Sequence, residues 1–164
     1  MAEPAAAPPG PPTIPPGTFR IDREGTWRHE GQEVTHAAVV RNLYENLRAD
    51  AGGCFLQIGP TRIAVAVDDA PFVVIRVEPV GGLAGATSGI RAWLSDGSEE
   101  PLVVESLWIG PRDTPYCGVK GGRFTARLAV PAWLQLARVT DEDPETGELS
   151  LVVGGHRVRI GRRP

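Results

Sequence analysis

The sequence predicts an α+β fold, mainly antiparallel β, in which duplicated ββαββ units are joined by a central strand region. Twenty glycines and 16 prolines among 164 residues indicate many turns and short strands. Between these turns, short runs alternate apolar and polar residues, which is typical of half-buried strands. Two longer stretches carry apolar residues at helical spacing, and each lies between pairs of such runs. This order of elements predicts the fold class.

The first unit opens with a predicted β-hairpin. Residues 19–29 alternate apolar and polar side chains around a central turn, with Phe19, Ile21 and Trp27 facing inward and His29 on the same face. This arrangement would give the hairpin one buried and one exposed face.

The helix of the first unit follows the hairpin. Apolar side chains recur at helical spacing up to Leu47, Thr35 is the predicted N-cap, and Gly52-Gly53 is the predicted end. Residues 54–58 and 62–67 are then predicted to close the unit as two strands.

The central segment, residues 68–110, is organised around a strand that begins at Phe72. Pro71 fixes its own φ and restricts Ala70 to extended conformations, so the chain enters this strand in one way. Phe72 to Ile75 is apolar on both faces, as in a strand that is covered on both sides. We therefore expect Phe72 to fill the core where the two units meet. Further strands are predicted at residues 90–95 and 102–109.

The second unit is predicted to repeat the order of the first. Its strands lie at 116–119, 123–127, 149–153 and 156–160, and its helix at 130–138. Trp27 would correspond to Phe124, and Ile63 to Val158, at nearly constant separation. The predicted organisation is one domain, 18–162, built of repeats at about 18–67 and 115–161.

Composition limits the class of protein. Residues 1–17 are rich in Pro and Ala, which predicts a disordered tail rather than a signal peptide. No apolar run is long enough to cross a membrane, and the formal net charge of −3 disfavours nucleic acid as a partner. Cys54 and Cys117 are predicted to be reduced thiols of a cytoplasmic protein.

The sequence lacks the common catalytic and cofactor motifs. It contains no nucleophile elbow, zinc-protease helix, Cys-x-x-Cys or phosphate loop. The acidic residues 141–145 do not complete a calcium loop, and no two histidines have the spacing of metal ligands on a helix. We therefore predict no cofactor and no metal.

The candidate site residues gather around Asp68 and Asp69. Adjacent carboxylates before a tight turn usually bond backbone N–H groups of that turn. The alternative is a polar ligand site at the mouth of the β core, which needs partners from elsewhere because neighbouring strand residues point in opposite directions. His29, Glu30 and Arg123 are the candidates for those partners.

Arginines on the predicted strands form a second pattern. Most should alternate outward into solvent, but guanidinium groups also suit phosphate and carboxylate. The strand arginines are Arg20, Arg28, Arg62, Arg123, Arg127, Arg157 and Arg159.

Several motifs resemble a bacterial family of uncharacterised proteins, the domain of unknown function 1285. They are Gly25-Thr26-Trp27-Arg28-His29-Glu30-Gly31, Val67-Asp68-Asp69-Ala70-Pro71-Phe72-Val73 and Pro115-Tyr116 with Lys120-Gly121-Gly122. The resemblance extends from about Phe19 to Gly161. It implies a mixed, mostly β fold with two repeated motifs, and it implies no particular activity, substrate or catalytic residue.

These observations favour a non-catalytic module that binds a small ligand or a protein partner in regulation or signal transduction. One alternative is an enzyme of unassigned reaction type that uses Asp68 or Asp69 with His29 or Glu30. Another is an interaction module with an arginine-rich, anion-binding face, and a homodimer is a further option for the partner. Convergence of a carboxylate, His29 and an arginine in one pocket would favour the enzyme.

Overall fold

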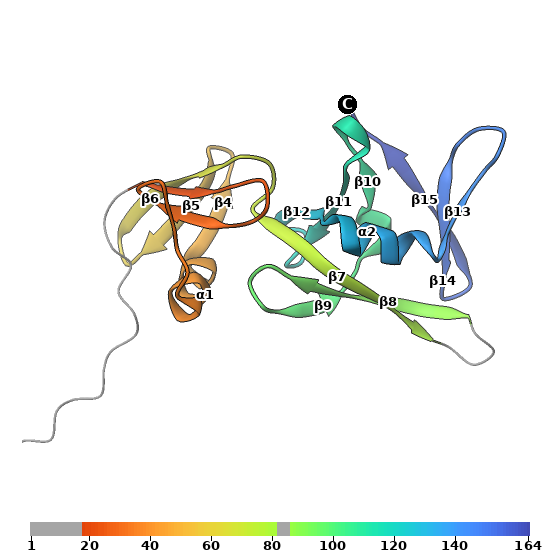
Figure 1. The fold of residues 1–164 in the computed structure, drawn as a ribbon, viewed down its shortest axis with the longest axis horizontal. Coiled ribbons are helices and arrows are strands. Elements are labelled where there is room, and N and C mark those ends of the chain that lie inside the picture. The colour runs from red at the N-terminus through yellow and green to blue at the C-terminus, as the bar shows by residue number, and fades with distance from the viewer. Residues whose placement is uncertain (1–17, 82–85) are drawn as a thin grey trace, which may run out of the picture.

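The structure, a computed structural model, describes residues 18–81 and 86–164 as two β-sheets, each with one helix (Figure 1). The predicted tail at 1–17 lies outside these residues. The sheets lie side by side along the long axis of the molecule, and the chain passes from one to the other just before β7 (Phe72–Gly81). A fold with mostly strands and two helices confirms the α+β class.

The six-stranded sheet contains the first part of the chain, in the order β3-β2-β1-β6-β5-β4. The first and last strands along the chain, β1 and β6, pair in parallel, and all other neighbouring strands of the sheet pair antiparallel. The helix α1 (Ala37–Asn46) buries Leu43 and Tyr44. The strands are β1 (Phe19–Ile21), β2 (Trp27–His29), β3 (Gln32–Glu33), β4 (Leu47–Asp50), β5 (Gly53–Ile58) and β6 (Thr61–Val67).

Both predicted ends of this first helix are wrong. His36, not Thr35, occupies the N-cap position, and its side chain makes no capping hydrogen bond. At the other end the chain becomes β4, whose Asp50 pairs with Gly53 in a tight hairpin. Gly53 has φ +112°, which glycine adopts without strain. The glycine pair therefore closes a hairpin instead of ending a helix.

The nine-stranded sheet has the order β13-β14-β15-β10-β11-β12-β7-β8-β9. Two pairs are parallel, β10 with β15 and β12 with β7. The helix α2 (Val130–Ala137) has Pro131 in its first turn, as predicted, and Gln135 Oε1 accepts a hydrogen bond from the Val77 N–H at 2.9 Å. The remaining strands are β8 (Thr87–Leu94), β9 (Glu99–Pro101), β10 (Trp108–Ile109), β11 (Pro115–Val119), β12 (Phe124–Leu128), β13 (Thr140–Glu142), β14 (Leu149–Val153) and β15 (His156–Arg162).

Two details of this sheet differ from the prediction. Most of 102–109 is not strand, because a 3₁₀ turn at Val104–Ser106 buries Val104 before the short β10 begins. Ile75 is 50% exposed, whereas Phe72, Val73 and Val74 are buried. The pairing of β7 with β8 shifts register between Val74 and Arg76, and this irregularity turns Ile75 out of the core.

The two blocks of strands share one connectivity. The order β3-β2-β1-β6-β5-β4 is matched by β12-β11-β10-β15-β14-β13, with the same parallel central pair. Ile63 and Val158 hold the same place in this scheme, since they pair with Leu56 and Leu151 respectively. Trp27 and Phe124 do not, because β2 corresponds to β11 and β12 corresponds to β3. Their predicted equivalence is wrong.

A chain of aromatic rings joins the two sheets through one hydrophobic core. The Trp27 ring lies 5.4 Å from that of Tyr44, Tyr44 lies 4.9 Å from Phe72, and Phe72 lies 5.1 Å from Phe124. Phe72 is only 2% exposed. Its predicted position in the core between the two parts of the chain is therefore confirmed.

Candidate functional site

A cavity of about 400 Å³ lies where α1 approaches two turns of the nine-stranded sheet. The first turn follows β8 and contains Asp96, and the second joins β11 to β12 and contains Lys120. Tyr44, Phe72 and Phe124 contribute apolar surface. Four cationic and two acidic side chains also line the cavity, which we call the cationic cleft: Arg41, Arg48, Lys120 and Arg123, with Glu45 and Asp96.

Lys120 connects the two turns, and its ammonium group is paired with an acid of the protein itself. Its Nζ lies 2.7 Å from Asp96 Oδ2 and donates to Ser98 Oγ at 2.6 Å. Its backbone N–H donates to Glu100 Oε1 at 3.0 Å, and its φ of +54° is unusual for a residue with a side chain. Burial raises the pKa of Asp96, but the bonds from Lys120 and Ser98 outweigh this effect and hold the pKa below its ordinary value. Lys120 is thus an anchor between turns.

The three arginines of the cleft have no carboxylate partner among the described residues. Arg48 donates through Nη1 to the carbonyl oxygens of Glu45 and Leu47, both at 2.8 Å, and Arg123 donates through Nε to the carbonyl of Lys120 at 2.9 Å. These bonds orient the guanidinium groups without neutralising them. Within residues 18–81 and 86–164, no ion pair involves Arg41, Arg48 or Arg123.

Elsewhere, arginines in ion pairs are common. Six of the seven predicted strand arginines pair with Asp or Glu, and Arg123 is the exception. Nine arginines form such pairs in the described parts of the chain: Arg20, Arg28, Arg62, Arg76, Arg91, Arg127, Arg157, Arg159 and Arg162. The cleft therefore concentrates cations that the protein's own acids leave available, although the chain carries a net charge of −3.

A second cavity of about 540 Å³, which we call the Asp69 cavity, shares Arg123 and Phe124 with the cleft. The Tyr116 hydroxyl donates to Asp69 Oδ1 at 2.7 Å. Oδ2 is buried without a hydrogen bond; it lies 3.5 Å from Arg127 Nε, which donates to the carbonyl of Arg23 instead. Burial and the Asp69 carboxylate together raise the pKa of Tyr116, so its hydroxyl stays a donor.

The Tyr116 ring is fixed by stacking against Trp108, with ring centroids 4.4 Å apart. Gly110 lies beside this pair, and a Cβ there would stand 2.7 Å from Tyr116 Cε2. Only glycine leaves room for the stack. The stack in turn fixes the phenol that holds Asp69.

The five predicted site residues do not form one site. Asp69 and Arg123 both line the Asp69 cavity, but Asp69 bonds a tyrosine side chain rather than the backbone of its own turn. Asp68 pairs with Arg20 at 2.9 Å in an exposed position. Neither His29 nor Glu30 lines either cavity.

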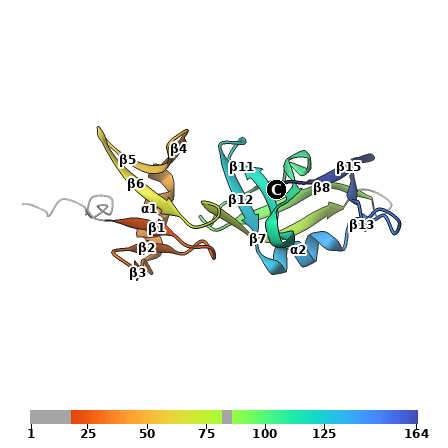
Figure 2. The same ribbon diagram turned by 90° about the horizontal axis from the view of Figure 1, so that it is seen from above.

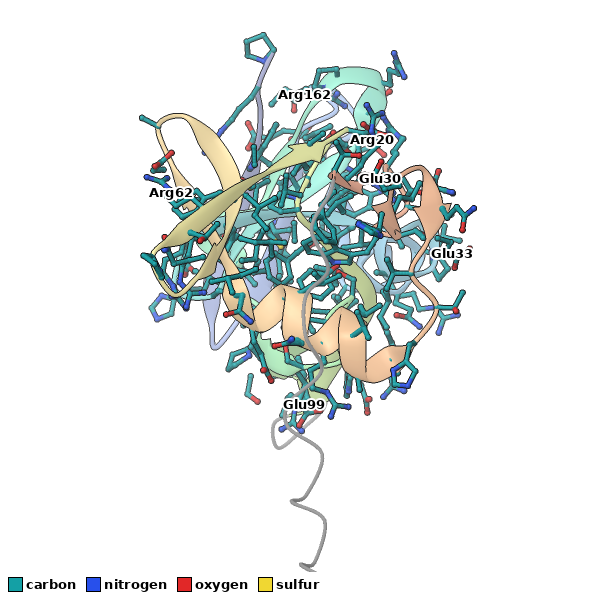
Figure 3. The ribbon with its side chains drawn as sticks, turned by 90° about the vertical axis from the view of Figure 1, so that its left-hand side faces the viewer. Arg20, Glu30, Glu33, Arg62, Glu99 and Arg162 are labelled. Carbon is teal, nitrogen blue, oxygen red and sulfur yellow. The ribbon has the colours of Figure 1, made fainter. Side chains whose placement is uncertain are left out.

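His29 and Glu30 lie near the β3 edge of the six-stranded sheet, whereas the two cavities lie beside β4 at the other edge. The His29 ring packs 4.8 Å from that of Phe19, and Glu30 accepts a hydrogen bond from the Thr18 N–H at 2.6 Å. Figure 3 shows Glu30 and Arg62 on opposite sides of this sheet. A carboxylate, His29 and an arginine therefore do not converge in these cavities.

Sequence reasoning missed Arg41, Arg48, Asp96 and Lys120. Arg41 and Arg48 are seven residues apart, which places them on one side of a helix and its continuation. Lys120 is the chain's single lysine and stands in a predicted turn. These two signals were available, but the approach of the turns to α1 is a tertiary feature.

Other site types find little support among the described residues. No group of three or more His, Cys, Asp or Glu side chains is placed to hold a metal within 18–81 and 86–164. Neither helix of the described chain is long and apolar enough to cross a bilayer. Cys54 and Cys117 are free thiols.

Comparison with solved structures places this architecture. The crystal structure of a DUF1285 family protein from Silicibacter pomeroyi DSS-3 matches with a TM-score of 0.73 at 22% identity, over 95% of this chain and 90% of that one. A DUF1285 family protein from Shewanella baltica OS155 matches with a TM-score of 0.62 at 17% identity, over 74% of this chain and 91% of that one. The chain has the DUF1285 fold.

The resemblance read from the sequence motifs is thus confirmed at the level of the fold. No family model matches the chain, and no curated protein matches it either. The DUF1285 fold alone assigns no chemistry. Function has to be argued from the cationic cleft and its neighbouring cavity.

Proposed function

We propose that the chain is a non-catalytic binding module that takes up an anionic ligand in the cationic cleft and acts in regulation. The observation that carries this proposal is the set of three arginines in one cleft that pair with no carboxylate in the part of the chain that the structure describes. Guanidinium groups are suited to carboxylate and phosphate, which they can bind through two parallel hydrogen bonds.

The shape of the cleft also supports binding. Its volume is within the range of small-ligand sites, and it combines an apolar surface with a few polar groups. Arg48 and Arg123 are held by backbone carbonyls, so little freedom is lost when a ligand binds. The half-buried Phe124 ring can accept an apolar part of the ligand next to its anionic group.

Calorimetric titration with pyrophosphate and with citrate tests the proposal. We expect at least one of these multivalent anions to bind, and Arg48→Gln and Arg123→Gln each to weaken binding about tenfold, a loss typical of one charged contact. Arg159→Gln is the matched control, because Arg159 is exposed, pairs with Glu148 and lines neither the cleft nor the Asp69 cavity. Equal weakening in the control, or no binding of either anion, would refute the proposal.

We further propose that the two blocks of shared connectivity are duplicated units of a single cytoplasmic domain. Their common strand order supports this history, as does the pairing of the first strand of each block in parallel with its last. Separate expression of residues 18–67 offers a test. A fragment that folds alone with the stability of the whole chain would contradict a single domain, because Tyr44 packs on Phe72.

A further inference from the structure

The cationic cleft and the Asp69 cavity are bordered by the same strand, β4. Leu47 and Arg48 line the cleft, and Ala49 and Asp50 line the Asp69 cavity. On the opposite side, Arg123 and Phe124 line both. Figure 2 shows the β4–β5 and β11–β12 hairpins on the same side of the molecule. The two cavities are therefore neighbouring parts of one groove.

The side of β4 that faces this groove is a free sheet edge. Among the described strands, β4 is the last of the six-stranded sheet, and β5 is its one neighbour there. The Leu47 N–H donates to the Tyr44 carbonyl, and the Leu47 carbonyl accepts from the Arg48 side chain. The backbone N–H and C=O of Leu47 therefore point away from β5. Because bonding alternates along an antiparallel pair, Ala49 turns the same way. Its N–H and C=O groups thus face the free side.

The opposite wall of the groove has a free edge as well. β12 pairs with β11 from Phe124 onward, but its pairing with β7 begins only at Ala126. Within residues 18–81 and 86–164, Phe124 and Thr125 therefore have a strand on one side only. An extended segment placed in the groove would lie between two backbone edges that the described strands leave uncovered.

We propose that the ligand of this groove is an extended, acidic peptide segment of a partner protein, which adds as a strand to β4. This inference rests on the proposed anion binding and specifies its ligand class. Strand addition supplies backbone hydrogen bonds, and side-chain pockets supply specificity. Carboxylates on one face of the peptide, two residues apart, meet the unpaired Arg48 and Arg123.

Charge and backbone chemistry exclude other peptides. Asp50 already pairs with Arg62 and accepts from the Gly52 N–H, so the acidic end of β4 offers little to a basic segment. A proline-rich segment lacks the N–H groups that pairing with β4 requires. The partner segment is therefore acidic and poor in proline.

Selection from displayed random peptides on the full chain tests the inference. We expect enriched peptides with acidic residues at alternating positions, and about tenfold weaker binding to Arg48→Glu than to the parent. Methylation of the peptide's backbone nitrogens at the alternation that faces β4 should abolish binding, because those N–H groups form the hydrogen bonds of the added strand. Hydrogen exchange of the Ala49 amide should slow on saturation, because that group gains an acceptor.

The outcomes separate the two proposals. If pyrophosphate or citrate binds through Arg48 but no peptide is enriched, anion binding stands and strand addition is refuted. Enriched peptides that are basic or proline-rich, that tolerate methylation at both alternations, or that leave Ala49 exchange unchanged also refute it. If neither anions nor peptides bind, both proposals fail.

Discussion

Replacing Phe72 with Ala should destabilise the whole chain, because its ring is the connection between the two sheets. Burial of a phenylalanine contributes about 1.5–3 kcal/mol. The contacts with Tyr44 and Phe124 add about 0.5–1.5 kcal/mol each. Together these agree with the loss of about 3–5 kcal/mol found for such substitutions. Because Phe72 also borders the cleft, water can enter the cavity that the substitution leaves, and we expect the free energy of unfolding to fall by about 3 kcal/mol.

Urea unfolding followed by tryptophan fluorescence measures this loss. A decrease of about 3 kcal/mol corresponds to a midpoint about 6–12 °C lower in a thermal scan of a chain of this size. Phe55→Ala is the control, since Phe55 is half-buried and its ring is covered by the Arg62 guanidinium at 3.6 Å. A double-mutant cycle of Phe72→Ala with Tyr44→Ala should give a coupling of about 0.5–1.5 kcal/mol. A loss below about 1 kcal/mol for Phe72→Ala would refute the role of the ring chain.

Three further predictions concern buried polar groups. Lys120→Met should lower the free energy of unfolding measured with urea by about 2 kcal/mol. This is less than the loss of a fully buried ion pair, because Lys120 and Asp96 are 20% and 14% exposed. An unchanged urea midpoint would contradict the role of Lys120 as an anchor between the turns. The pKa of Asp96 in the folded chain lies below its ordinary value of 3.8, so the ionised carboxylate stabilises the fold above pH 3.8, and this stabilisation is lost as the pH falls through the lowered pKa. Asp96→Asn should therefore flatten the acid side of a plot of unfolding free energy against pH. An unchanged acid side would contradict the stabilising role of the Asp96 carboxylate. Burial raises the pKa of Cys117 to about 12, so iodoacetamide at mildly alkaline pH should modify Cys117 only after unfolding, as peptide mass spectrometry would show.

The predictable parts of the fold were those set by local pattern. Alternation from Phe19 to His29 identified the first hairpin, and Pro131 identified the start of the second helix. The end of the first helix was misjudged because a glycine pair suits a helix terminus and a hairpin turn equally well. Distinguishing them required the pairing of residues 47–50 with β5, which sequence periodicity does not reveal.

The candidate site was less predictable because tertiary contacts determine which charges remain available. Seven strand arginines look alike in sequence, but six find carboxylates and Arg123 does not. Asp69 was identified from its turn, but its partner Tyr116 lies 47 residues away. Such long-range pairings have no signal in the local pattern of a single sequence.

The parallel pairing of β1 with β6 has a consequence for the order in which the chain can fold during synthesis. All strands of the six-stranded sheet are available once residue 67 has left the ribosome, so this sheet can close early. At that stage the Tyr44 ring has no partner from the second sheet. Phe72 follows within a few residues, and β8 can pair with β7 once Leu94 has been made, but β12 covers the other edge of β7 only after Leu128. The nascent protein must therefore carry an apolar strand with one uncovered edge until β12 is complete, a period in which a chaperone that binds extended chains would protect it from aggregation.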